Sequence, residues 1–368
     1  MTARRRLFLP TLARHLTGEF LRAFALTMVA FVAIYILAEF FDRFDDFLRH
    51  DASASTIVRA FLYKIPSILL QTTPVAVLAG ALAGLGLLAR NNEFVALRSC
   101  GVSLWQIAVP LAIVAIGIGV ATFLWGETVV PASARQWNQI WNQEVRKRTG
   151  PAGVFAGREV WFHGRAGFYN VNRIAPGRRK LYGLTIYQMR RDEFRPSRVI
   201  ESKEAEWKDG AWVLSPDART MRLGSDGVRE EAGVPQGFVL PESLDDFRVV
   251  AVEPEEFSYS MLRRQIRSLR AKGVDASESW VDLHLKIATP AASLIMMLLA
   301  IPLVARGTRA TSLPAAFGLG FAVGVTYFFV VGFARALGQA NAFPPLLAAW
   351  TANGIFMLLA GYYFAAAD

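Results

Sequence analysis

The chain has 368 residues, of which 53% are hydrophobic and only 19% are charged. Soluble domains carry about 25% charged residues, so this composition favours a membrane protein. The formal net charge of +10 raises the question of a nucleic-acid partner. The arginines are scattered through loops and a central polar segment, and they do not form the basic stripe that such a partner requires. We therefore predict no nucleic-acid binding.

Six stretches reach the roughly 20 apolar residues that a helix needs to cross a bilayer. They cover residues 20–41, 65–89, 104–125, 287–305, 312–334 and 346–364. The first exceeds the apolar core of a secretory signal peptide, and we interpret it as an uncleaved signal anchor. Three stretches precede a long polar insert and three follow it. The predicted fold is a polytopic α-helical membrane protein with a 3+3 layout and an inserted domain, divided into residues 1–130, 131–256 and 257–368.

Lysines and arginines in short loops mark the cytoplasmic side of a membrane protein. Such residues precede the first stretch, separate the second from the third, and separate the fourth from the fifth: Arg4, Arg5, Arg6, Arg14, Arg90, Arg98, Arg306 and Arg309. The loops on the other side are acid-rich or carry a single arginine. The pattern predicts that both termini are cytoplasmic and that the insert is exported.

The polar stretch "RNNEFVALRSCGVS", residues 90–103, separates the second and third apolar stretches. Asn91 or Asn92 is suited to begin a helix, Glu93 lies in the first turn where the helix dipole favours an acid, and Gly101 is suited to end it. We predict a short helix across the membrane face at about 91–103; a plain capped loop is the alternative. Cys100, the only cysteine, is interpreted as a small buried hydrophobic residue.

The insert contains short runs rich in β-branched and aromatic residues, among them "EVWFH", "GFYNV", "LTIYQM" and "AWVLS", separated by turn signals. This spacing predicts an all-β domain of the sandwich or jelly-roll type. Alternation places Trp161, Tyr169, Ile186 and Trp212 on the inward face. A packed core and an open apolar groove need the same residues, so both interpretations stay open.

The segment "SYSMLRRQIRSLRAKG" follows the insert and predicts a basic amphipathic helix, because Leu262, Ile266 and Leu269 share one face. Two positions are compatible with it: the outer membrane surface and the surface of the β domain. The second and fifth apolar stretches carry Gly80-x-x-x-Gly84 and Gly320-x-x-x-Gly324, which are close-packing patterns of membrane helices.

Several catalytic motifs are missing from the sequence. It contains no G-x-x-x-x-G-K-[ST] loop for nucleotide phosphates, no H-E-x-x-H and no G-x-S-x-G, and its four histidines have no ligand spacing. We predict that the chain is not an enzyme and that it has no catalytic residue, metal site or cofactor of its own.

Three segments carry a resemblance to a known family. They are "TPVAVLAGALAGLGLLARNNEFVALRSCGVS", "AVEPEEFSYSMLRRQIRSLRAKGVDA" and the "MMLLAIPLV" that follows. Together with the 3+3 layout around a β insert, they resemble the LptF/LptG lipopolysaccharide export permeases over essentially the whole chain. The flank after the insert is more similar to the LptG type than to the LptF type.

The resemblance implies a permease subunit of an ABC-type exporter in the bacterial inner membrane. Such a subunit extracts lipopolysaccharide and passes it, through a periplasmic β-jelly-roll domain, to a bridge of similar domains. The implied partners are a cytoplasmic ABC ATPase dimer that hydrolyses the ATP, a second permease of the LptF type, and a bridge protein of the LptC/LptA type.

The resemblance also implies roles for individual residues. The short cytoplasmic helix would be a coupling helix held in a groove of the ATPase, with contacts from Glu93, Phe94, Leu97, Arg98 and Gly101. The fifth span would meet the first span of the partner permease at a lateral gate, packed through Gly318, Gly320 and Gly324. The lipid path would include the inward residues of the β insert, Trp161, Tyr169, Ile186 and Trp212.

One feature departs from the family pattern. Family members tend to offer the lipid phosphates a basic residue near the outer end of the first span. Here Glu39 precedes Arg43 by four residues, a spacing that allows the two charges to neutralise each other on one helix face. Both residues belong to the expected lipid path, but the partner permease would then supply the charge for the phosphates.

Two other functions remain open on the sequence alone. One is an ABC permease of the lipoprotein-release or mechanotransmission kind, although these usually have four spans with the exported domain after the first. The other is a membrane-anchored assembly or binding protein without transport.

Overall fold

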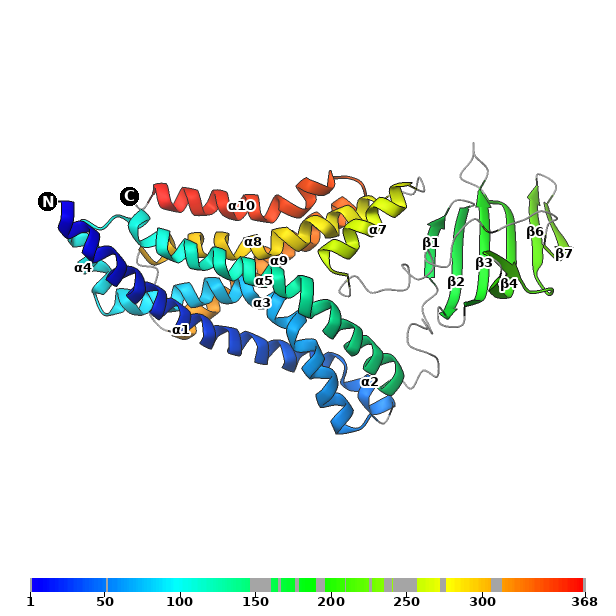
Figure 1. Cartoon of the computed structure of the whole chain (residues 1–368), viewed down its shortest axis with the longest axis horizontal. Helices are drawn as coiled ribbons and strands as arrows, with labels where there is room; N and C mark the ends of the chain where they lie inside the picture. Colours follow the sequence, from blue (N-terminus) through cyan, green and yellow to red (C-terminus); the bar gives the residue numbers. More distant parts are fainter. Residues whose placement is uncertain are drawn as a thin grey trace.

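A computed structural model describes residues 2–50, 52–145, 160–164, 167–175, 179–189, 196–208, 210–224, 227–234, 240, 257–271, 276–305 and 313–366. A bundle of long helices forms one end of the elongated molecule, and an antiparallel β-sheet forms the other end (Figure 1). Both termini lie at the end of the bundle that is remote from the sheet, close to a short helix.

The helices are α1 (Thr2–Asp42), α2 (Phe44–Arg49), α3 (Ala54–Arg90), α4 (Glu93–Ser99), α5 (Leu104–Ile140), α7 (Tyr259–Ala271), α8 (Ser277–Ala305), α9 (Leu313–Gln339) and α10 (Pro345–Ala365), and a π-helical turn (Trp141–Val145) extends α5. Within the described residues, six of these helices are long and apolar enough to cross a membrane: α1, α3, α5, α8, α9 and α10. The six predicted spans are confirmed.

Helix α5 runs through the predicted boundary at residue 131. It contains 37 residues, and at 1.5 Å per residue such a helix is about 56 Å long, well beyond the roughly 30 Å of hydrocarbon in a bilayer. Its last turns pack Trp137 and Ile140 against Phe47 of α2 and Phe61 of α3. Residues 131–140 are therefore helical and belong to the bundle, because this aromatic cluster buries their apolar face.

The strands are β1 (Val160–Gly164), β2 (Gly167–Ala175), β3 (Lys180–Met189), β4 (Pro196–Lys208), β5 (Ala211–Leu214), β6 (Arg219–Gly224) and β7 (Gly227–Ala232). They form one antiparallel sheet in the order β1-β2-β3-β4-β6-β7, and β5 pairs with the last residues of β4. The predicted all-β insert is confirmed. Strand β7, "GVREEA", was not predicted, because it carries three charged residues in a row and pairs only at the edge of the sheet.

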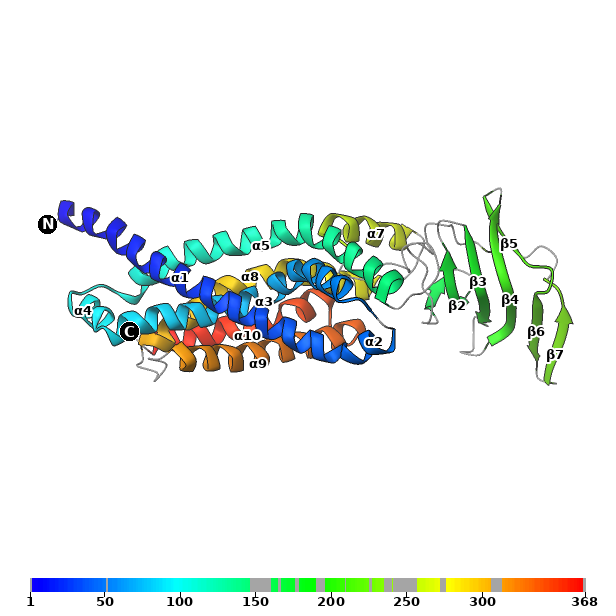
Figure 2. The same ribbon diagram turned by 90° about the horizontal axis from the view of Figure 1, so that it is seen from below.

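Helix α7 packs alongside α8 at the end of the bundle next to the sheet (Figure 2). Leu262 and Ile266 are buried together with Leu283 of α8. The sequence left the membrane surface and the β domain open as positions for this helix. Among the described residues, its apolar face is covered by the start of α8.

Candidate coupling and lipid-entry sites

Helix α4 is bracketed by two residues in the left-handed conformation, Asn92 (φ 62°) and Gly101 (φ 81°). At its end the N–H of Gly101 donates to the carbonyl of Arg98 at 2.9 Å, and the N–H of Val102 donates to the carbonyl of Leu97 at 3.1 Å. This pair of bonds is the Schellman motif, which favours glycine at the left-handed position. The chain therefore leaves and re-enters the bundle through two sharp, defined reversals.

Two side chains hold α4 against the rest of the bundle. The ring of Phe94 is buried in the main core cluster, next to the first residues of α5. The Oε2 atom of Glu93 lies 2.9 Å from Nε2 of His15 on α1. This hydrogen bond is the main reason why the pKa of Glu93 falls below its usual value of 4.5. The position of α4 is thus fixed both to the core and to the first span.

The exposed face of α4 consists of Val95, Ala96 and Ser99, and the side chain of Val95 is 57% exposed. Leu97 and Arg98 are half-buried. Of the predicted contact set, Phe94 is therefore buried in its own bundle, whereas Val95, which the prediction omits, is exposed. The helical spacing groups residues on a face but does not say which face is covered.

The interpretation of Cys100 as a buried residue was wrong. Cys100 occupies the C-cap position of α4, and its side chain is exposed. A residue at this position lies at the edge of the reversal, where the bundle core does not reach.

The glycines of the close-packing patterns contact the same chain. A Cβ atom on Gly80 would lie 2.6 Å from Cα of Phe24 in α1. On the neighbouring face of α3, a Cβ atom on Gly320 would lie 2.6 Å from Cβ of Ala79, and one on Gly324 would lie 2.6 Å from the γ carbons of Val75. The sequence analysis instead placed Gly320 and Gly324 against a partner permease. Of the three glycines in the predicted gate, only Gly318 has open space at its Cβ position.

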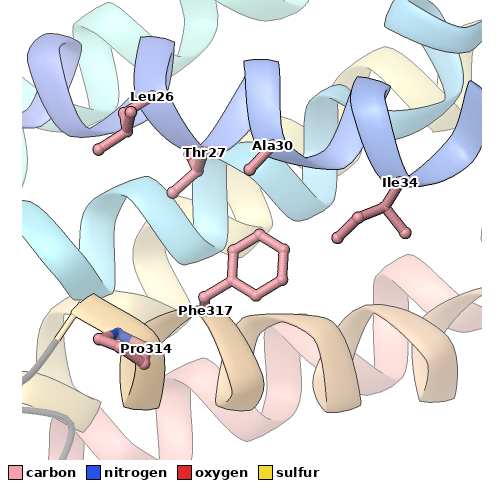
Figure 3. Close-up of a pocket in the computed structure, with 6 residues that line it drawn as sticks. All are labelled: Leu26, Thr27, Ala30, Ile34, Pro314 and Phe317. Carbon is pink, nitrogen blue, oxygen red and sulfur yellow. The ribbon is translucent and has the colours of Figure 1, made fainter.

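A pocket of about 330 Å³ lies between α1 and α9 (Figure 3). The ring of Phe317 points from α9 towards α1. The other residues that line the pocket are Leu26, Thr27, Ala30, Ile34 and Pro314. The hydroxyl of Thr27 donates to the carbonyl of Ala76 at 3.1 Å, so its hydrogen is already used within the chain and the pocket lining is largely apolar. Leu26 and Ile34 are about half exposed, and the pocket is therefore open on the surface of the bundle.

Arg43 is engaged within the chain at the sheet-side end of α1. Its Nε atom donates to Oε1 of Glu39 at 2.6 Å, the i,i+4 pair that the sequence spacing predicts. Its guanidinium carbon lies 4.4 Å from the ring centroid of Trp141 and 5.3 Å from that of Trp137. The positive charge of Arg43 is therefore already engaged by one carboxylate and two indole rings of the same chain.

The inward residues of the sheet form a packed core. Tyr169 and Ile186 are 0% exposed, and Trp212 is 4% exposed. Their neighbours include Leu184 and Ile200, also fully buried. The side chain of Trp161 lies outside the described residues. A fully covered side chain offers no surface to a ligand, so the packed-core interpretation describes Tyr169 and Ile186 in this structure.

Within the described parts of the chain, no group of three or more His, Cys, Asp and Glu side chains is arranged to hold a metal ion. The polar side chains in the bundle instead cross-link its helices. The hydroxyl of Tyr327 on α9 donates to Asn353 of α10, whose amide donates in turn to the carbonyl of Ala288 on α8. These groups satisfy one another inside the membrane-spanning region.

A family model described as "Lipopolysaccharide export system permease LptF/LptG" matches residues 14–366. The chain belongs to the LptF/LptG family. The lipopolysaccharide export system permease protein LptG of Escherichia coli (strain K12) is 23% identical over 299 residues, which cover 81% of this chain and 82% of that protein. LptG of Haemophilus influenzae is 24% identical over 323 residues, covering 87% of this chain and 88% of that one.

The LptF/LptG match spans all six candidate membrane helices and the sheet, and the resemblance noted in the sequence is confirmed. Both relatives are LptG proteins, as the flank after the insert predicts. In this family member, α4 is therefore the connection between the second and third spans of a permease.

Proposed function

We propose that this chain is the LptG-type permease subunit of an ABC-type lipopolysaccharide exporter in the bacterial inner membrane. The observation that carries the proposal is the family match over residues 14–366. Because the sequence has no phosphate-binding G-x-x-x-x-G-K-[ST] loop, ATP is hydrolysed by a separate ABC ATPase dimer. The chain itself is a mechanical part of the exporter and not an enzyme.

The termini and α4 face the cytoplasm in this proposal, and the sheet is periplasmic. Support comes from the arginine-rich loops, and from the position of both termini and α4 at the same end of the bundle, opposite the sheet (Figure 1). One orientation thus satisfies the charge pattern and brings α4 to the side where ATP is available.

Helix α4 is the coupling helix of the proposed exporter, and Val95, Ala96 and Ser99 form its contact with the ATPase. Phe94 anchors the helix in the core, and Glu93 joins it to His15 of α1. A displacement of α4 is therefore passed both to the centre of the bundle and directly to the first span. A short helix fixed at two points transmits a push better than a flexible loop.

Lipid enters between α1 and α9 of this chain and the corresponding helices of a second, LptF-type permease. The exposed face of α9, with Phe321, Val325, Phe328 and Phe329, is apolar and carries no charge that a separating helix would leave unpaired. Gly318 lies open near the cytoplasmic end of α9. Because Gly320 and Gly324 pack on α3, they hold α9 in place, and the gate surface is formed by the phenylalanines and Gly318.

Lipopolysaccharide then passes along the β-sheet to a bridge protein of the LptC/LptA type. Tyr169, Ile186 and Trp212 can contact acyl chains only after the inner face of the sheet has been uncovered, since these side chains are buried. The guanidinium group of Arg43 already forms an ion pair with Glu39 and lies over two tryptophan rings. We therefore assign the lipid phosphates to basic residues of the partner permease.

Reconstitution tests the proposal. The chain is co-expressed with candidate ATPase and LptF-type subunits, purified as a complex, and placed in liposomes that contain lipopolysaccharide. ATP-dependent transfer of lipopolysaccharide to a soluble bridge domain is expected. Transfer of lipoproteins instead, or no transfer from a complex that hydrolyses ATP, would contradict it.

A further inference from the structure

Helix α7 presents an exposed basic face. Arg263, Arg264 and Arg267 are all exposed, whereas Leu262 and Ile266 on the opposite face are buried against α8. A fourth arginine, Arg270, lies over the ring of Trp280, with its guanidinium carbon 4.7 Å from the ring centroid. We call Arg263, Arg264 and Arg267 the arginine face of α7.

The described parts of the chain do not neutralise the arginine face. None of their ion pairs includes Arg263, Arg264 or Arg267. Glu127 of α5 does reach α7, but both of its oxygens are used by the backbone. They accept hydrogen bonds from the N–H groups of Tyr259 at 2.6 Å and Ser260 at 3.2 Å. Glu127 thus fixes the first turn of α7 to α5 and leaves the three cations open to the surroundings.

The first turn of α7 lies at the edge of the hydrocarbon region. The apolar stretch of α5 ends near Trp125, and the rings of Phe123 and Tyr259 meet edge to face with centroids 6.0 Å apart. On α8, Trp280 precedes the apolar part of the fourth span. Tryptophan and tyrosine gather at the boundary between membrane and water. The arginine face therefore begins at the level of the lipid headgroups on the sheet side.

We infer that the arginine face of α7 binds the phosphate headgroups of anionic glycerophospholipids in the leaflet on the sheet side. The guanidinium group forms paired, charge-assisted hydrogen bonds with phosphate oxygens. Because Leu262 and Ile266 pack on α8, the arginine face is turned away from α8. In Figure 2, α9 lies on the other side of α8, so the α1–α9 pocket is not next to α7. The inference goes beyond the proposed transport function and does not depend on its direction.

The bound lipids hold α7 at a fixed height in the membrane. Because Glu127 binds the first turn of α7 to α5, the outer end of the third span is held at the same height. Helix α7 is the first helix after the sheet in the chain, so the bound lipids would also fix the point at which the chain re-enters the bundle.

A photo-crosslinking experiment tests this inference. Ser268 is exposed one turn after Arg264, and a photo-reactive amino acid at this position samples the lipids next to the arginine face. The full-length chain is placed in nanodiscs of phosphatidylglycerol and phosphatidylcholine, and captured lipids are identified by mass spectrometry. Each arginine near an anionic surface is expected to favour the anionic lipid about fivefold. Capture should therefore be strongly enriched in phosphatidylglycerol relative to the bulk mixture.

Substitution of Arg263, Arg264 and Arg267 by Gln should return capture to the bulk ratio, and so should 1 M salt, where the Debye length is only about 3 Å. The matched control replaces Arg219, Arg222 and Arg229 of the β6–β7 hairpin by Gln. It removes the same charge far from the membrane boundary and should leave capture unchanged. If the triple variant does not fold, each single Gln variant should still lower the enrichment about fivefold.

Three outcomes would overturn the inference: capture at the bulk ratio by the native chain, the same enrichment in the α7 variants, or a preference for lipopolysaccharide when it is added in equal amount. The last outcome would assign the arginine face to the transported lipid. ATP-driven export is measured separately, so failure of the lipid-binding inference and failure of the proposed transport function remain distinguishable.

Discussion

The second span differs from the first and fifth in how it is surrounded, although all three are apolar enough to cross a membrane. In α3, 89% of the most apolar stretch is buried inside the chain, compared with 17% in α1 and 22% in α9. Helix α3 is the fixed centre of the bundle, and α1 and α9 each keep one side free. The difference separates a span that is enclosed by its own chain from two spans that each have a face free to contact lipid or another protein.

Small residues make this arrangement possible. Gly80 of α3 receives the backbone of α1, and Ala79 and Val75 on the neighbouring face receive Gly320 and Gly324 of α9. Membrane helices have no hydrophobic drive to associate within lipid and depend on such close contacts. The free faces carry large side chains, such as Phe329 at 72% exposure. Gly80, Gly320 and Gly324 thus mark contacts within this chain, and Phe329 marks a face that the described parts of the chain leave free.

The largest expected effect comes from placing a bulky side chain in the contact between α1 and α3. In Gly80→Leu the new Cβ atom would lie 2.6 Å from Cα of Phe24, and backbone atoms cannot rotate away. We expect a loss of about 3 kcal/mol in the free energy of unfolding and little folded protein by size-exclusion chromatography. Gly318→Leu is the matched control, because no atom lies within 4 Å of its Cβ position. Equal yield and thermal stability of the two variants would refute the fixed contact.

The second prediction applies the same contrast between covered and free faces to α4. Val95→Asp should leave the thermal stability of the chain unchanged, because Val95 is exposed. It would place a charge in the proposed ATPase contact and weaken binding by about 2 kcal/mol, or roughly thirtyfold. Phe94→Ala should instead lower stability, because the ring is buried. A pull-down and a thermal melt on both variants separate the two effects, and unchanged ATPase binding by Val95→Asp would contradict the assignment.

The smallest effect concerns the link between α4 and α1. Because the hydrogen bond with His15 lowers the pKa of Glu93 below 4.5, the ionised acid stabilises the fold above that pH. This contribution is lost as the pH falls through the lowered pKa. The pair is exposed, so Glu93→Gln should cost less than about 1 kcal/mol near neutral pH and nothing in strong acid. In a His15→Gln background the difference should vanish at every pH; its persistence would show that the pair does not form.

The sequence predicted the six spans and most strands because each depends on a local pattern. Twenty apolar residues require a membrane helix, and alternation along "GFYNV" and "LTIYQM" placed Tyr169 and Ile186 on the buried side of the sheet. The reversal at Gly101 was predictable for the same reason, since the left-handed end of a helix favours glycine.

Contacts between helices were not predictable in this way. In a membrane, the lipid-facing and core-facing residues of a span are both apolar, so hydropathy cannot assign Gly318 to an open face and Gly320 to a packed one. Phe94 and Val95 are likewise both apolar, so the sequence could not show that Phe94 is buried and Val95 is exposed. The cap of Glu127 on α7 joins residues more than a hundred positions apart, and no local pattern indicates it.

A reversible crosslink tests most directly whether lipid enters between α9 and the first span of a second permease. In a Cys100→Ser background, Phe329→Cys is paired with one cysteine in the first span of the co-expressed permease. A cysteine at Leu358, which is 76% exposed and belongs to α10 rather than α9, provides the control. The account predicts that the disulfide at position 329 stops ATP-driven lipopolysaccharide transfer and that reduction restores it. Undiminished transfer with that disulfide fully formed would contradict it.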